Sequence, residues 1–243
     1  KELDKRLNKD INFDIIKREL LIGKRNSALY FIDGFIKDEV FEKMLEYLFK
    51  QTDKDLEQIK DMQNFSLDKM PYVEVDYTYD TDTAVNQVLS GPAVLIIDGI
   101  DGALIIDTRT YPSRSPEEPQ KDKSLRGSRD GFVETLVVNT ALIRRRIRSE
   151  NLRMEYMSVS GNSKTDIVIS YIDGLADKKT LKNLKKALKN IKLKSVSMTS
   201  EALTEALIPH KFFNPFPRFK LTERPDFASA AILDGKIVVI MDN

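Results

Sequence analysis

The sequence contains no cysteine and only one histidine, His210. Without cysteine the chain has no disulfides, thiolate metal sites or cysteine nucleophiles. Histidine-ligated metal sites and Ser-His-Asp catalysis usually need more than a single histidine can supply. His210 lies between a proline and a lysine, where a loop histidine is a simpler interpretation than a base or a ligand.

The sequence also lacks the short motifs that bind phosphates or build hydrolase sites. It has no Gly-x-x-x-x-Gly-Lys, Gly-x-Gly-x-x-Gly or Gly-x-Ser-x-Gly pattern. Two carboxylate pairs, Asp80 with Asp82 and Asp98 with Asp101, do not have EF-hand spacing, and turn formation or helix capping explains both. We therefore predict no enzyme, no cofactor and no metal, and hydrolysis by carboxylates alone is the enzymatic alternative left open.

Long apolar runs are missing as well. No stretch approaches the roughly 20 apolar residues that span a bilayer, and no signal peptide is visible. The 243 residues, 41% of them hydrophobic and 32% charged, suffice for one large or two small domains. The net charge of +1 does not indicate a nucleic-acid partner. Because the chain starts at Lys1 and ends directly after the apolar run 237–241, we expect a piece of a longer protein.

Two segments of the sequence repeat the pattern Ile-Asp-Gly, at residues 30–35 and 170–175. Each is followed by apolar residues at helical spacing. A second pair of apolar segments, 93–106 and 230–241, is predicted to form hairpins, the later one with Asp-Gly at its turn. We interpret the repeats as an internal duplication. The alternative is that Ile-Asp-Gly is simply a common way to end a buried strand.

The predicted fold class is α/β with mixed sheets, in two related subdomains of roughly β-α-β-α-β-β order. Short strands at 72–75 and 194–198 and helices at 81–89 and 200–207 complete the two halves. The predicted segments are an N-terminal helix and connector at 1–28, a first subdomain at 29–109, a connector loop, basic-ended helix and hairpin at 110–165, and a second subdomain at 166–243.

The middle segment opens on a charged, proline-containing connector over residues 108–123. A helix is predicted to follow, capped by Ser128, running through Phe132 and ending at the arginine cluster before residue 148. The hairpin that comes next turns at residues 161–163.

Four residues are candidates for ligand binding. Asp33 and Asp173 follow strands at the end where open α/β sheets place ligands. Arg126 and Arg129 precede the predicted helix, where anions are favoured. The simpler alternative for both aspartates is a turn in which the carboxylate accepts a backbone hydrogen bond.

Two basic clusters are candidates for interfaces. Arg144, Arg145 and Arg146 end the middle helix, and Lys182, Lys185 and Lys189 lie on a helix after the second repeat. Eight lysines and one acid give residues 177–194 a net charge of +7, whereas residues 37–61 carry −3. This asymmetry favours contact with an anionic membrane or an acidic partner. A solvated helix surface explains the same lysines.

Several stretches of the chain resemble the A subunit of spore germinant receptors, the GerA family. They include Lys-Arg-Asn-Ser-Ala-Leu-Tyr-Phe-Ile-Asp-Gly at 24–34, Gly-Pro-Ala at 91–93, Arg-Ser-Pro-Glu-Glu-Pro at 114–119 and Pro-Phe-Pro-Arg at 215–218. Another is Arg-Gly-Ser-Arg-Asp-Gly-Phe-Val-Glu at 126–134, where Ser128 stands in place of the proline expected in the family. The stretches span nearly the whole chain in the family's order.

The resemblance implies that the full subunit continues past Asn243 into a multi-spanning region of the spore inner membrane, with this domain facing the spore core. It also implies a transporter-like B subunit and a lipoprotein C subunit as partners in nutrient sensing. Self-association and contact with anionic lipid are further candidate interactions.

We therefore predict a domain for signal sensing, transduction and complex assembly. The alternatives are a nutrient-binding module with its pocket between the two subdomains and a purely structural platform.

Overall fold

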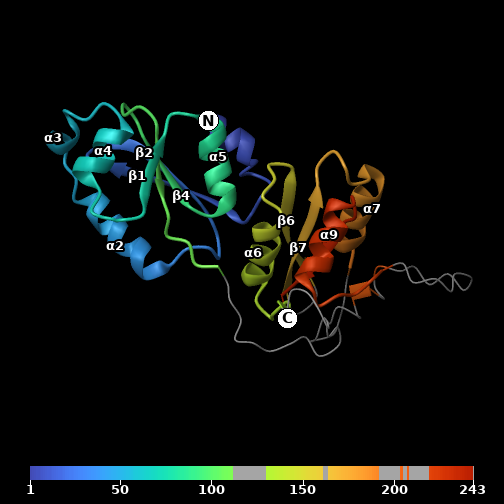
Figure 1. Cartoon of the computed structure of the whole chain (residues 1–243). Coiled ribbons are helices and arrows are strands. Elements are labelled where there is room, and N and C mark those ends of the chain that lie inside the picture. The colour runs from blue at the N-terminus through green and yellow to red at the C-terminus, as the bar shows by residue number, and fades with distance from the viewer. Residues whose placement is uncertain (112–129, 161–163, 192–202, 205–206, 208–218, 243) are drawn as a thin grey trace, which may run out of the picture. The chain divides into compact units, whose positions relative to one another are not determined.

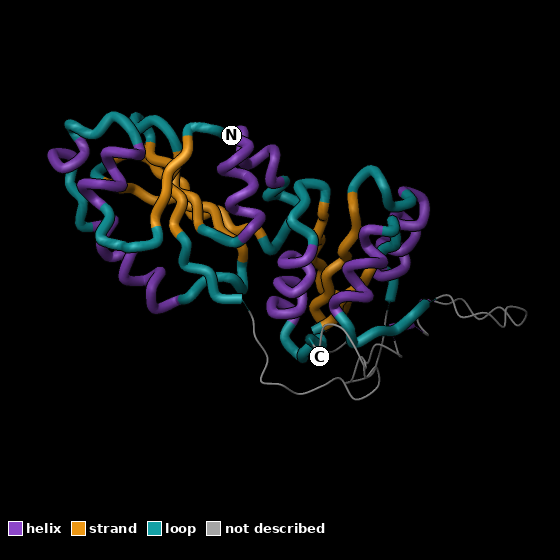
Figure 2. Tube along the Cα trace, in the orientation of Figure 1, coloured by secondary structure: helices purple, strands orange, loops and turns teal. Residues whose placement is uncertain are grey.

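The computed structural model describes residues 1–111, 130–160, 164–191, 203–204, 207 and 219–242. The chain divides into two compact units. Unit 1 comprises Lys1–Pro112 and Arg148–Glu150, and unit 2 comprises Ser113–Ile147 and Asn151–Asn243. Each unit has its own β-sheet with helices on both faces (Figure 1, Figure 2). The predicted α/β class is confirmed.

The sheet of unit 1 has five antiparallel strands in the order β1-β2-β4-β5-β3. Their bounds are Ile15–Ile22 for β1, Arg25–Ile32 for β2, Val75–Thr78 for β3, Ala93–Ile97 for β4 and Ala103–Ile106 for β5. The strands β4 and β5 consist of apolar residues only, because helices cover both faces of the sheet. The predicted hairpin at 93–106 is the antiparallel pair β4-β5.

Five helices cover the sheet of unit 1. They are α1 (Glu2–Leu7), α2 (Asp38–Phe49), α3 (Asp53–Leu56), α4 (Met62–Lys69) and α5 (Thr81–Ser90). The last of these confirms the predicted helix at 81–89. Helices α2, α3 and α4 bury their apolar residues in one cluster with β1, β2, β4 and β5, while α5 packs on the sheet together with α1.

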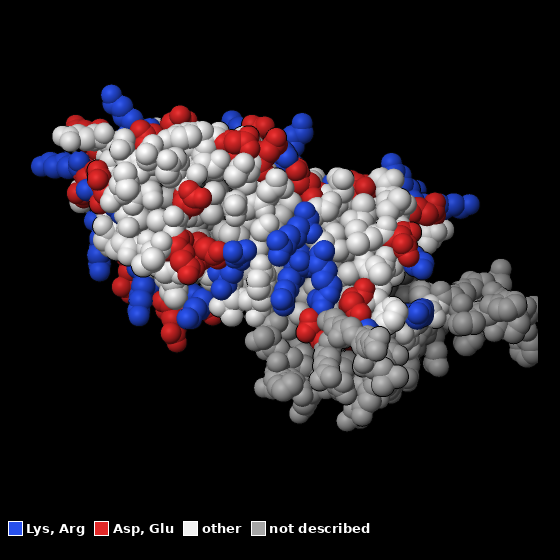
Figure 3. All heavy atoms as spheres, in the orientation of Figure 1, with Lys and Arg blue, Asp and Glu red and all other residues white. Residues whose placement is uncertain are grey.

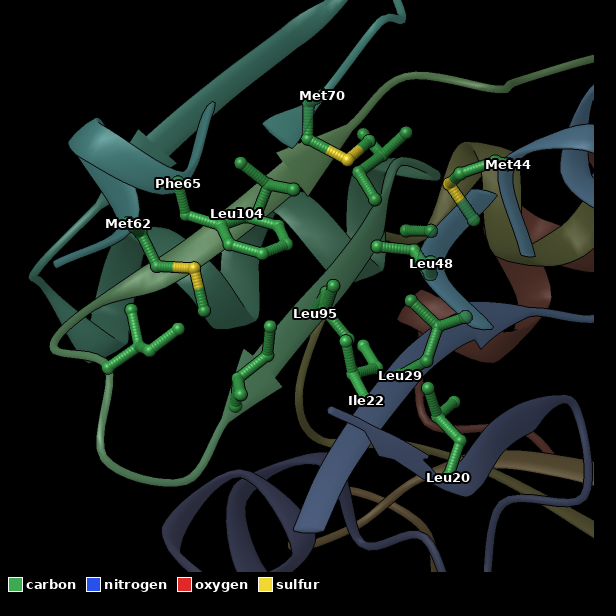
Figure 4. Close-up of a cluster of buried hydrophobic side chains, with 14 of the residues drawn as sticks. Leu20, Ile22, Leu29, Met44, Leu48, Met62, Phe65, Met70, Leu95 and Leu104 are labelled. Atoms are coloured by element: carbon green, nitrogen blue, oxygen red, sulfur yellow. The ribbon is translucent and has the colours of Figure 1, made fainter. Parts of the chain in front are cut away.

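The cluster that α2, α3 and α4 form with the sheet is the larger part of the core of unit 1 (Figure 4). Side chains from α2 and α4 meet strand residues such as Leu29, Leu95 and Leu104, all fully buried. Burying a leucine or phenylalanine side chain completely stabilises a fold by about 1.5–3 kcal/mol. Unit 1 is therefore held together mainly by apolar contacts.

The N-terminal residues differ from the prediction of one helix with a connector over residues 1–28, because they also form a strand. Helix α1 ends at Leu7, and Asn8 takes the left-handed conformation with φ of 48°. The chain then forms β1, which pairs with β2 along its whole length through a turn at Gly23 and Lys24, both at positive φ. The β-branched residues of β1 favour a strand, and pairing with β2 outweighs the helical spacing of Leu3, Leu7 and Ile11.

Among the residues that the structure describes, the sheet of unit 2 has three antiparallel strands in the order β6-β7-β8. They span Leu152–Ser160, Lys164–Ile172 and Val238–Met241. The predicted hairpin around residues 161–163 is confirmed by the pairing of β6 with β7. Alternate residues of β7 face opposite sides, and Ile167, Ile169 and Tyr171 join a core cluster with α7 (Lys178–Lys189).

Two further helices of unit 2, α6 (Leu136–Arg146) and α9 (Pro225–Leu233), pack against each other and against β7 and β8. The prediction that this helix starts after Ser128 and runs through Phe132 is wrong, because α6 begins only at Leu136. The side chain of Asn139 bonds both the N–H and the C=O of Val133, at 2.8 and 2.6 Å, and so holds the preceding residues out of the helix.

The predicted hairpin at 230–241 is also wrong. Residues 225–233 form α9, which starts with Pro225 in its first turn and continues through an alanine-rich run. Gly235, with φ of 82°, ends the helix, so the Asp-Gly pair is a helix stop rather than a hairpin turn. Strand β8 pairs with β7 instead.

The remaining predictions are only partly covered by the structure. Strand β3 begins at Val75, where the predicted strand 72–75 ends. The predicted strand 194–198 and most of the helix 200–207 and of the connector 108–123 lie outside the described residues. Each unit contains a hairpin followed by a helix and, later, a helix followed by a strand that pairs with the hairpin. A duplication stays a prediction.

Candidate functional site

Asp33 lies in the turn between β2 and α2 in unit 1. Its N–H donates to the C=O of Asp14 at 2.8 Å, and Gly34 follows with φ of 82°. Burial raises the pKa of the half-buried Asp33 carboxyl, and the hydrogen bond from the Gly34 N–H works in the opposite direction. The geometry is that of a structural turn with a partly desolvated carboxyl.

Asp173 lies in the corresponding turn after β7, in unit 2. Its N–H donates to the C=O of Asn151 at 2.8 Å, and Gly174 has φ of 83°. Its carboxylate forms a salt bridge of 2.9 Å with Arg153, a residue otherwise buried. Asp173 itself is 52% exposed. The other two ligand candidates, Arg126 and Arg129, lie outside the described residues.

The three arginines at the end of α6 have three different environments. Arg144 is fully buried. Arg145 is exposed, and Arg146 binds Asp130 at 2.6 Å and the C=O of Leu142 at 2.9 Å. The structure therefore does not bring them together as one surface, and Arg144 is in no position to touch a partner.

Helix α7 carries six lysines and no acidic residue. Its apolar residues Leu181, Leu184 and Leu188 pack on the sheet of unit 2. Five lysines are exposed and will be called the α7 lysine face: Lys178, Lys179, Lys182, Lys186 and Lys189. Two of the predicted interface residues, Lys182 and Lys189, belong to this face.

Lys185, the third predicted interface lysine, binds inward. Its ammonium lies 2.6 Å from the Glu155 carboxylate and 5.7 Å from the centre of the Tyr171 ring. The Tyr171 hydroxyl donates to the same carboxylate. Burial and this hydrogen bond raise the pKa of Tyr171. Lys185 thus fixes α7 on the sheet, and the other lysines point outward.

An apolar groove of about 290 Å³ lies between α2 and the residues after α4. Its lining consists of Val40, Lys43, Met44, Tyr47, Met70, Pro71 and Tyr72. The Tyr72 hydroxyl is already bonded to the C=O of Asp107 at 3.1 Å. The groove offers few polar groups that would orient a small nutrient such as an amino acid or a sugar.

One polar cluster of unit 1 has no signal in the sequence. Arg6 of α1 binds both oxygens of the Glu150 carboxylate and also contacts Asp82 of α5. Arg6 and Glu150 are 144 residues apart in the chain, so no local pattern predicts their contact. The pair holds the segment between α6 and β6 in unit 1.

The carboxylates weighed as metal ligands have structural roles. Asp80 caps α5 by accepting the N–H of Thr83 at 2.8 Å, and hydrogen bonds from Thr83 lower the pKa of its carboxyl. Asp101 lies in the β4–β5 turn and exchanges backbone hydrogen bonds with Lys60 and Met62. Among the described residues, no group of three or more His, Cys, Asp or Glu side chains is placed to hold a metal ion. His210 lies outside them.

Within the same described ranges, none of the helices has the length and apolar character needed to cross a bilayer.

The whole chain, residues 1–243, matches the family model described as Bacillus/Clostridium GerA spore germination protein. Among curated relatives, stage V sporulation protein AF of Bacillus subtilis (strain 168) is 35% identical over 98% of this chain and 48% of its own length. The uncharacterized membrane protein YfkQ of the same organism is 34% identical over 95% of this chain and 44% of its own length. The chain thus spans about half the length of these relatives.

A solved structure agrees with this match. The N-terminal domain of the A subunit of the Bacillus megaterium spore germinant receptor GerK3 is 27% identical, with a TM-score of 0.72 over 99% of this chain and 88% of that one. These names describe sporulation, germination and receptor proteins, not enzymes, as the sequence predicts. The chain belongs to the GerA family of spore germination proteins.

Proposed function

We propose that this domain transduces a nutrient signal and helps to assemble a germinant receptor during spore germination. The observation that carries the proposal is the likeness to the solved A-subunit domain, which extends over 99% of this chain. The two separately cored units add to it, because domains with independent cores can shift relative to one another without unfolding.

The connections between the units suggest how a signal would pass. The chain changes unit at residues 112–113, 147–148 and 150–151. Of residues 148–150, Glu150 is bound by Arg6 of unit 1, and this short segment connects α6 with β6. A displacement of either element would therefore pull on Glu150 and on α1.

The proposed partners and location rest on the family resemblance. We propose that the full-length protein continues into a membrane-spanning part, as the name of the relative YfkQ as a membrane protein supports. Its partners would be a transporter-like B subunit and a lipoprotein C subunit in the spore inner membrane, with this domain facing the spore core. The name of the solved relative as an A subunit supports a receptor of several subunits.

The test of transduction uses the full-length protein in spores. Arg6→Ala is expected to weaken nutrient-triggered germination, followed as the fall in optical density, while a trigger that bypasses the receptor stays effective. Lys9→Ala is the matched control, because it removes one exposed positive charge nearby without touching Glu150. Equal responses of the two variants, at equal receptor levels, would contradict transmission through Glu150.

Direct nutrient binding by this domain is the rival function. A thermal-shift screen with amino acids, sugars and nucleosides separates the two. A ligand at about 100 times its Kd adds roughly 2.7 kcal/mol, or about 5–11 °C for a chain of this size. We expect no such shift, and a selective, saturable one would assign recognition to this domain.

A further inference from the structure

The α7 lysine face is unusually uniform. At about 100° per residue, all six lysines of α7 fall within an arc of roughly 120°, and its three leucines lie beside this arc. Five of the lysines are exposed, and none of these five forms a salt bridge with any other residue that the structure describes. In Figure 3, basic side chains project from the margin of unit 2 that carries α7, and a few acidic side chains lie beside them.

This charge pattern opposes the stability of the helix itself. Lys178 and Lys179 occupy the first turn, where the helix dipole disfavours cations. Lys178 with Lys182, and Lys182 with Lys186, are like charges four residues apart, which repel each other. Stability would be served better by glutamates at some of these positions, so an external anion is the simplest reason for the pattern.

Exposed leucines accompany the lysines. Leu175, two residues before the N-cap of α7, is 54% exposed and lies against Gly235, where an added Cβ would be 3.1 Å from its Cγ. Leu233, two residues before Gly235, is also 54% exposed. Exposed Lys236 follows. Apolar side chains among lysines are typical of surfaces that lie on a lipid headgroup layer.

We propose that the α7 lysine face, with Leu175, docks on the surface of a membrane rich in anionic lipids. Lysine presents compact, hydrated charges that suit a diffuse layer of phosphates, whereas a defined carboxylate or phosphate site favours the planar fork of arginine. The leucines add an apolar contact that a nucleic acid backbone would not use. The inference rests on the proposed function only in placing the domain beside a membrane.

The experiment is co-sedimentation of the 243-residue chain with phosphatidylcholine vesicles, with and without about 30 mol % phosphatidylglycerol, at low and at high salt. We expect binding only to the anionic vesicles, and its loss at high salt. The variant K182Q/K186Q/K189Q should bind on the order of 100-fold more weakly, because each lysine near such a surface contributes about a factor of five. Glutamine keeps the helix propensity.

The control variant K50Q/K54Q/K60Q removes three exposed lysines of unit 1 and the same charge. It should bind like the unchanged chain, and neither variant should melt below the unchanged chain, since removing like charges four residues apart on α7 relieves repulsion. Equal losses in the two variants would reduce the effect to net charge and overturn the proposal.

Absence of binding to anionic vesicles at low salt would also overturn the proposal, and would leave the germination test of the proposed function unaffected. Sedimentation of the chain without vesicles tests the rival partner, an acidic protein surface on a second copy of the chain. A dimer that the α7 variant abolishes, together with no vesicle binding, would show that the lysine face serves an acidic protein surface.

Discussion

The two units place a helix of the same length after the same Asp-Gly turn, yet these helices carry opposite charge. Helix α2 in unit 1 has four acids and one lysine, whereas α7 in unit 2 has six lysines. Both helices bury leucines in the core of their own unit. The difference shows that the buried side of the helix serves the fold, while the outer side is free to select different partners.

The interiors of the units differ as well. The buried residues of the main core cluster of unit 1 are all apolar and come from seven named elements and the loops between them. The described sheet of unit 2 is smaller, and three of the described arginines of this unit are buried: Arg144, Arg153 and Arg224. Buried cations need partners, so the stability of unit 2 depends more on specific polar contacts.

The largest expected effect tests whether the two cores are independent. Phe65 of α4 is fully buried in unit 1, so Phe65→Ala should cost about 3–5 kcal/mol of stability. Hydrogen exchange should show lost protection in β2 and β4 and little change in β6 and β7. Leu67→Ala in the same helix is the control, because Leu67 is 75% exposed. Equal loss of protection in β6 and β7 would mean that the units unfold as one.

Local sequence signals predicted the elements whose residues decide their own conformation. The apolar runs of β4 and β5 and the capped helix α5 are examples. The failures came where a contact outside the residue pattern decides: β1 is a strand because β2 pairs with it, and α6 starts late because the Asn139 side chain hydrogen-bonds Val133. An Asp-Gly pair suits a hairpin turn and a helix stop equally, so the sequence alone did not separate the two at Gly235.

The candidate site divides in the same way. The exposed lysines of α7 follow from helical periodicity, because three leucines fix which side faces the sheet. The burial of Arg144 and the pairing of Arg6 with Glu150 depend on tertiary packing. No pattern of neighbouring residues distinguishes Arg144 from Arg145.

A smaller effect separates these two arginines. Arg144→Ala should lower the stability of the chain by about 2–3 kcal/mol. The substitution removes a fully buried guanidinium and leaves the groups that interact with it without their partner. Arg145→Ala, at an exposed position, should stay within about 0.5 kcal/mol of the unchanged chain. Urea unfolding measures both. Similar small effects of the two substitutions would show that unit 2 does not depend on a buried cation.

The smallest effect compares the two Asp-Gly turns through pH. Burial raises the pKa of Asp33 above its ordinary value of 3.8, so the folded state holds the proton more tightly and stability falls as the pH rises from that value through the folded pKa. Asp33→Asn should therefore stabilise the chain at neutral pH, with the gain vanishing near pH ~3. Asp173→Asn should instead cost up to about 1 kcal/mol at neutral pH, because it removes the exposed side of the salt bridge to Arg153. Urea midpoints at the two pH values measure both variants. Shifts of the urea midpoint with the same sign in both variants at neutral pH would mean that the two turns are equivalent. Burial would then not determine the pKa of Asp33.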